Sequence, residues 1–86
     1  MESIVSLCEL SPGEAGVIAE LRTEGALARR LRDLGFSAGT RAACRGRAPA
    51  GDPTAYLVRG AVLALRRSDA AAILVRPLEG RKAPWA

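Results

Sequence analysis

The stretch RAPAGDPTAYLVRGAVLALRR, residues 47–67, decides the fold, because it predicts two short β-strands joined by a tight turn. Tyr56 and Val58 share one face of the first strand, and Leu63 and Leu65 are in phase in the second. Gly60 allows the turn between the two strands. We therefore expect a β-hairpin that ends in paired arginines and follows a rigid Gly-Asp-Pro corner.

Three more strands are expected outside the hairpin, at 16–21, 40–48 and 73–78. In the second of these, Ala42 and Cys44 alternate with Ala43 and two arginines. Cys44 is therefore predicted as a small core residue, since free cysteine is often buried, and Ala43 is predicted to face outward.

One amphipathic helix is predicted at about 25–34, with Thr23 as its N-cap. The leucines of its apolar stripe are Leu27, Leu31 and Leu34. Gly35 stands where a left-handed residue ends a helix, and Phe36 can fold back onto the last turn. This helix is expected to pack across one opening of the sheet.

Two shorter helical pieces are predicted near the ends of the chain. Ser6 and Glu9 have the spacing of a capping box, which indicates a helical turn near 6–10. Ser68 is placed to begin a short helix near 68–73.

These elements predict a mainly β fold, a small SH3-like barrel of about five strands. Closing a short, strongly bent sheet would remove its exposed edges. The chain has 86 residues, enough for one small core. We expect a single domain over residues 1–78 and a mobile C-terminal tail over 79–86, which is polar and interrupted by proline.

Composition argues against an enzyme. The chain has no histidine, which removes the commonest general base, and its glycines form neither a phosphate-binding loop nor a dinucleotide fingerprint. No apolar run approaches the roughly 18 residues of a membrane span, so no membrane insertion is expected. Two cysteines are too few for a disulfide framework, and we expect a reduced, cytoplasmic protein.

Cys8 and Glu9 are weak candidates for a metal site on a turn expected to be exposed. A thiolate and a carboxylate suit Fe(II) or zinc, but they make half a site that a second chain would have to complete. An ordinary surface thiol is the alternative interpretation. No cofactor is expected to be required.

Charge is distributed unevenly along the chain, whose net charge is +4. Residues 1–24 carry five glutamates and one arginine, whereas residues 41–67 carry six arginines and one aspartate. Arginine binds carboxylates and phosphates through its planar fork. A small basic nucleic-acid-binding barrel is therefore an alternative function, although Tyr56 is expected in the core and leaves few aromatic platforms for bases. We expect the chain not to bind nucleic acid.

Three segments together resemble the FeoA family of bacterial ferrous iron transport proteins. They are LARRLRDLGFSAGT (27–40), RAPAGDP (47–53) and VRGAVLALRRSDAAAILV (58–75), in that order and spacing. The resemblance implies an SH3-like barrel without enzymatic activity that binds and modulates the permease FeoB, which has a cytoplasmic GTPase domain. The family is also similar to the C-terminal SH3-like domain of diphtheria-toxin-repressor-type regulators, so a metal-sensing module is a further alternative.

The hairpin supplies the predicted partner-binding residues: Ala55, Leu57, Arg59, Arg66 and Arg67. The family often has charged or polar residues at 57 and 62, where this chain has Leu57 and Val62. We expect Leu57 to face outward as an apolar spot bordered by arginines, a composition typical of binding hot spots. A solvated rim is the alternative interpretation. An exposed strand edge can also mediate a homodimer.

Overall fold

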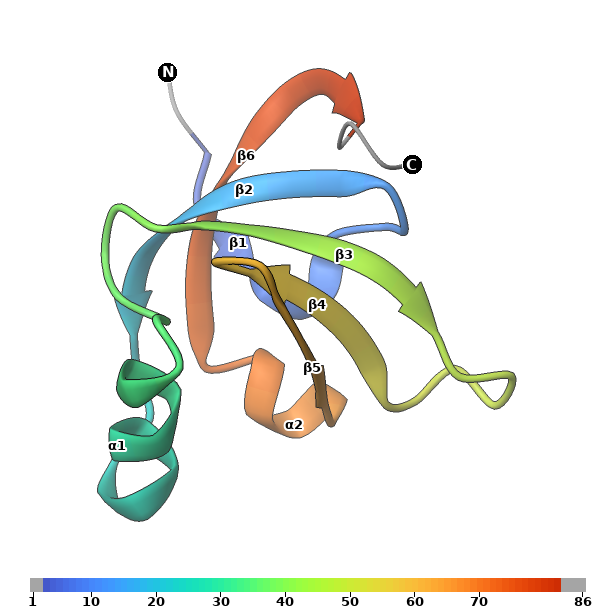
Figure 1. Cartoon of the computed structure of the whole chain (residues 1–86). Helices are drawn as coiled ribbons and strands as arrows, with labels where there is room; N and C mark the ends of the chain where they lie inside the picture. Colours follow the sequence, from blue (N-terminus) through green and yellow to red (C-terminus); the bar gives the residue numbers. More distant parts are fainter. Residues whose placement is uncertain (1–2, 83–86) are drawn as a thin grey trace.

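The computed structural model describes residues 3–82, and strands dominate it, as predicted (Figure 1). Its elements are β1 (Val5–Ser6), η1 (Leu7–Glu9), β2 (Glu14–Leu21), α1 (Gly25–Asp33), β3 (Arg41–Arg47), β4 (Thr54–Val58), β5 (Ala61–Leu65), α2 (Arg67–Ala70) and β6 (Ile73–Lys82). The hairpin and the helix of the prediction therefore exist within one or two residues of their expected bounds.

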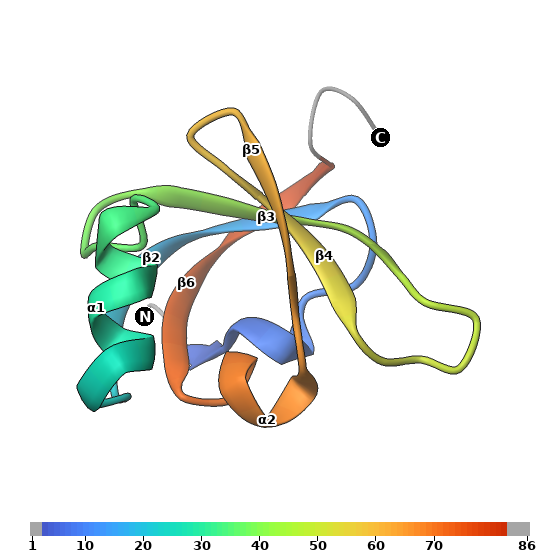
Figure 2. The same cartoon turned by 60° about the horizontal axis from the view of Figure 1, so that its bottom comes forward.

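The strands form one antiparallel sheet in the order β1-β6-β2-β3-β4-β5. It is strongly twisted, and β5 crosses over the other strands in Figure 2. The expected mainly β fold is confirmed, with a sixth strand beside the roughly five expected; within residues 3–82 the edge strands β1 and β5 do not pair with each other, so the sheet does not close. The physical reason is that β1 has two residues before the chain leaves the sheet as η1, too few to pair along β5.

The concave side of the sheet holds the core. Its largest fully buried side chains are Tyr56, Phe36, Leu7, Ile18, Leu31, Ile73, Val58, Val75 and Cys44. Tyr56, Val58 and Cys44 are therefore inward, as predicted. A second, smaller cluster joins Ala15, Ala43 and Leu78. Ala43 was predicted to face outward, and it is nevertheless buried because Leu78 packs against it.

Helix α1 ends as its sequence predicts. Gly35 has φ +100°, and Phe36 donates its N–H to the Leu31 carbonyl at 2.9 Å while Gly35 donates to Arg32 at 3.0 Å. This pair of bonds is a Schellman motif, with Phe36 buried behind the last turn. The predicted N-cap at Thr23 is wrong: Glu24 holds that position and its side chain makes no capping bond.

The short helical pieces lie side by side under the sheet in Figure 2. The predicted capping contact exists in η1, where the Ser6 N–H donates to the Glu9 carboxylate at 2.9 Å. The Ser6 hydroxyl donates to the Ala71 carbonyl at 3.0 Å, which joins the loop after α2 to this end of the sheet.

Helix α2 begins earlier than predicted, with Arg66 rather than Ser68 as N-cap. The reason is a distant carboxylate: Asp52, in the proline-rich corner, accepts the Arg67 N–H at 2.9 Å and so satisfies a first-turn donor. Strand β6 continues to Lys82, four residues into the segment predicted as a tail, and residues 83–86 lie outside the described part.

Candidate partner-binding surface

The β4–β5 hairpin has a two-residue loop, and this loop fixes which groups face which way. Arg59 has φ +53° and Gly60 has φ +81°, the positive values that a type I′ turn requires. The register pairs Val58 with Ala61, Leu57 with Val62 and Ala55 with Ala64. Leu57, Val62, Ala55 and Ala64 therefore share the face of the hairpin opposite Tyr56, which we call the outer patch.

Exposure within the outer patch differs from the prediction. Leu57 is half-buried, whereas its cross-strand neighbour Val62 is 56% exposed. Val62 is consequently the exposed large apolar side chain of the outer patch, and Leu57 lies half-buried beside it on the neighbouring strand.

The arginines do not form one cluster around Leu57. Arg59 lies in the turn, while Arg66 and Arg67 follow the opposite end of β5. A five-residue strand separates them by about 17 Å at ~3.4 Å per residue. The structure thus brings Ala55 and Leu57 together and places positive charge at the two ends of the outer patch.

The Arg59 side chain of the hairpin turn lies against the residue that ends the last turn of α1. A Cβ at Gly35 would lie 2.5 Å from the Cδ of Arg59 and 3.2 Å from its Cγ. The arginine stem therefore runs over the bare glycine that follows the helix. Gly35 supplies the left-handed backbone there, and a side chain at this position would require the Arg59 stem to shift.

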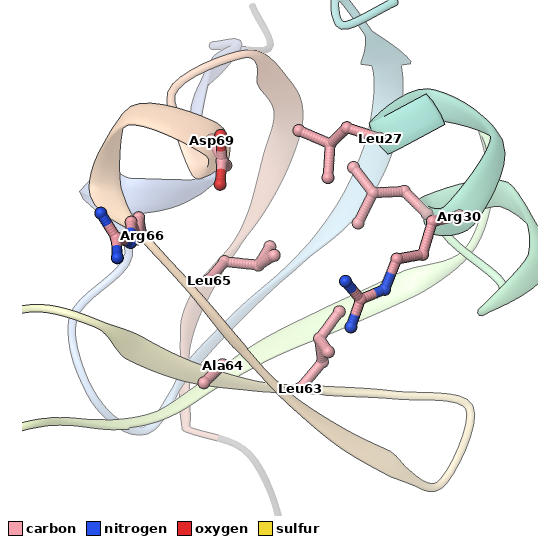
Figure 3. Close-up of a pocket in the computed structure, with 8 residues that line it drawn as sticks. Leu27, Arg30, Leu63, Ala64, Leu65, Arg66 and Asp69 are labelled. Atoms are coloured by element: carbon pink, nitrogen blue, oxygen red, sulfur yellow. The ribbon is translucent and has the colours of Figure 1, made fainter. Parts of the chain in front are cut away.

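A groove opens on the other side of β5, between that strand and α1 (Figure 3). It has a volume of about 190 Å³, and its lining residues are Leu27, Arg30, Leu31, Leu63, Ala64, Leu65, Arg66 and Asp69. Arg30 reaches from α1 toward Leu63, and Leu27 points into the space between helix and strand. The groove thus has an aliphatic floor and charged ends.

Sequence reasoning missed the groove because it depends on a contact between distant elements. Leu27 belongs to the apolar stripe of the predicted helix, and Leu63 to the alternating pattern of the predicted strand. Neither pattern predicts that α1 lies beside β5. The one usable signal was an arginine, Arg30, next to the apolar stripe of the helix.

The candidate metal ligands are not arranged as predicted. Cys8 is 8% exposed and belongs to the core, because η1 turns its side chain inward. The Glu9 carboxylate is exposed and accepts the Ser6 N–H. Within residues 3–82, no group of three or more cysteine, aspartate or glutamate side chains is positioned to hold an ion.

Two groups in the described part of the chain have a shifted pKa, and both are core residues. Burial raises the pKa of the Cys44 thiol, and burial raises the pKa of Tyr56 to about 12. Both groups therefore stay protonated and uncharged at neutral pH, which is compatible with their place in an apolar core. Tyr56 and Phe36 are each 1% exposed, so neither offers a stacking platform, and Trp85 lies outside the described residues. No helix in the described part has the length and apolarity to cross a membrane.

Comparison with known proteins places the chain. The FeoA domain matches residues 5–77, and no curated protein sequence matches. The solution structure of the FeoA protein from Chlorobium tepidum is 34% identical, with a TM-score of 0.83, over 93% of this chain and 76% of that one.

Two more structures share the fold. FeoA from Stenotrophomonas maltophilia, described as a prokaryotic SH3-domain protein complexed with zinc, is 32% identical with a TM-score of 0.74, over 83% of this chain and 88% of that one. A manganese-dependent transcriptional repressor shares the fold at 20% identity, with a TM-score of 0.78, over 91% of this chain and 44% of that one. The predicted SH3-like fold is confirmed, and the chain belongs to the FeoA family.

Proposed function

We propose that this chain is a non-enzymatic accessory protein of ferrous iron uptake, which binds the cytoplasmic, GTPase-containing part of a FeoB-type permease and modulates transport. Membership of the FeoA family supports the link to ferrous iron. The Stenotrophomonas maltophilia relative is described as a candidate ferrous iron transport activating factor. The chain would act in the cytoplasm, where that part of the permease lies.

One observation carries the proposal: an uncharged patch with arginines at both ends stands on the β4–β5 hairpin. Val62 is 56% exposed above the half-buried Leu57, and the inner face of the same strands holds the buried Tyr56. Apolar side chains at the centre of a contact lose water on binding, and flanking charges align the partner. An acidic surface is the natural complement of this arrangement.

Modulation requires only differential binding. If the chain binds one conformation of the permease more tightly than another, the population shifts by the ratio of the two affinities. Neither a resident metal nor a reacting side chain enters this mechanism. The chain contains no histidine, and its two cysteines are buried.

The test is Leu57→Asp, with Ala50→Asp as a matched control in the exposed β3–β4 loop. A carboxylate at this half-buried position of the outer patch should abolish co-purification with the permease and ferrous iron uptake. The control adds the same charge elsewhere and should preserve both. Thermal unfolding of the purified variants checks that Leu57→Asp stays folded, so that lost binding can be assigned to the surface. We expect the substitution at this half-buried site to lower the free energy of unfolding by about 1–2 kcal/mol. Uptake and binding that survive in a folded Leu57→Asp protein would contradict the proposal.

A further inference from the structure

We propose that the groove between α1 and β5 binds an extended acidic segment of the partner, which adds to β5 as a seventh strand and inserts one apolar side chain beside Leu63. The inference rests on the proposed function for the partner being a protein. It goes beyond that function in naming a second surface and the chemistry of what fits there.

The edge of β5 is open for pairing. In a two-residue hairpin the closing pair exchanges both hydrogen bonds, so the backbone groups of Ala61, Leu63 and Leu65 face β4. The N–H and C=O groups of Val62 and Ala64 then point away from the sheet. Among residues 3–82, β4 is the only strand beside β5. Exposed edges are commonly guarded by lysine, proline or a bulge, and none of these interrupts Ala61–Leu65.

The position of the groove determines which side chain of an added strand would enter it. Residues directly opposite one another on neighbouring strands point to the same face. A residue opposite Leu63 therefore points toward α1, into a space of about 190 Å³ lined by Leu27, Leu31 and Leu65. A cavity of about 150 Å³ can hold benzene, so one leucine-sized side chain fits.

Charge selects an acidic occupant. Arg30 and Arg66 are exposed at the groove, and among the described residues neither forms an ion pair. Among the described residues, Asp69 is the single acidic one lining the groove, which leaves its ends with a net positive charge. Carboxylates two positions on either side of the inserted residue would point to the same face and come within reach of the arginines.

The same charges disfavour a second copy of this chain as the occupant. Antiparallel pairing of two β5 strands centred on Leu63 would place Ala61 and Leu65 of the second copy two positions on either side of its Leu63, where an acidic segment would carry its carboxylates. A second copy would thus bring no carboxylate to Arg30 and Arg66 at the groove. A self-paired edge is therefore the weaker occupant.

The experiment titrates the isolated chain with a blocked peptide, acetyl-Thr-Glu-Thr-Leu-Thr-Glu-Thr-amide, and follows backbone amide shifts by NMR. Shifts should concentrate at Ala61–Leu65 and Leu27. Replacing both glutamates by lysine, or N-methylating the threonines that flank the leucine, should weaken binding by about tenfold or more, since each removes charge pairs or strand hydrogen bonds.

Arg30→Glu and Arg29→Glu form the matched pair of variants, because both residues are exposed on α1 and only Arg30 lines the groove. Arg30→Glu should reverse the preference toward the lysine peptide, and Arg29→Glu should leave it unchanged. Equal binding of all peptides, shifts away from β5, or equal effects of the two variants would overturn the proposal. Shifts in β5 that depend on protein concentration alone would assign the edge to a second copy instead.

This assay contains no permease, so its result is separate from the test of Leu57→Asp. Failure of the peptide to bind leaves association with FeoB intact. Binding of the peptide in a chain that does not associate with FeoB would retain the groove and reject the proposed function.

Discussion

The two edges of the sheet are built differently. At one edge, β1 has two residues, and the chain turns at once into η1, whose Leu7 is fully buried. The Ser6 hydroxyl joins this edge to the carbonyl of Ala71. At the other edge, β5 has five residues, one partner strand and an exposed Val62.

The difference separates stability from recognition. An edge that is short and covered offers no template for another chain, whereas an open, uncharged one does. Substitutions at the β1 edge should therefore change the free energy of unfolding, and substitutions at the β5 edge should change binding. This assignment would be refuted if substitutions at the β1 edge changed binding and substitutions at the β5 edge changed the free energy of unfolding.

The largest expected effect belongs to the covered edge. Leu7→Ala removes a fully buried side chain from η1 and should lower the free energy of unfolding by about 2–5 kcal/mol, because the cavity cannot fully collapse. Urea unfolding measures this loss. Ile4→Ala, three residues earlier and 51% exposed, is the control and should stay within about 0.5 kcal/mol. Similar values for the two variants would mean that η1 does not anchor this edge.

An intermediate effect is expected where α1 meets the hairpin turn. Gly35→Ala places a side chain at φ +100°, a left-handed conformation that costs about 1–2 kcal/mol, and directs its Cβ into the Arg59 stem. Gly39→Ala is matched to it, since φ is +91° there and nothing lies within 4 Å. Thermal unfolding of both separates backbone strain from the contact with Arg59.

We expect the Gly35 variant to lose more stability than the Gly39 variant and to displace α1 from β5. Amide shifts at Leu27 and Leu63 would report that displacement. If the two losses are equal, the arginine stem moves aside freely and does not hold the helix against the hairpin.

Much of this architecture could be predicted from local patterns. The alternation in Tyr56 and Val58, the turn at Gly60 and the termination of α1 at Gly35 and Phe36 depend on neighbouring residues alone, and all are confirmed. The predictions that were wrong concern features set by contacts between residues far apart in the sequence. Asp52 moves the start of α2, and Leu78 covers Ala43.

The candidate surface divides in the same way. Strand alternation placed Ala55 and Leu57 on one face, as the register shows. It could not show that Val62 is the more exposed residue, nor that the arginines stand at opposite ends, since both depend on how the hairpin pairs. The groove depends on α1 lying beside β5, which no local pattern states.

The smallest effect on stability, and the sharpest test of the open edge, is expected at Val62. Val62→Asp and Val62→Lys change a side chain that is 56% exposed, so both should leave the free energy of unfolding within about 0.5 kcal/mol. Their effects on binding should differ. An acidic partner surface would repel the aspartate and tolerate the lysine, so Val62→Asp should weaken co-purification with the permease by about tenfold or more relative to Val62→Lys. Equal losses would show that the patch is read by its apolar shape alone, and a loss confined to lysine would mean that the partner surface is basic.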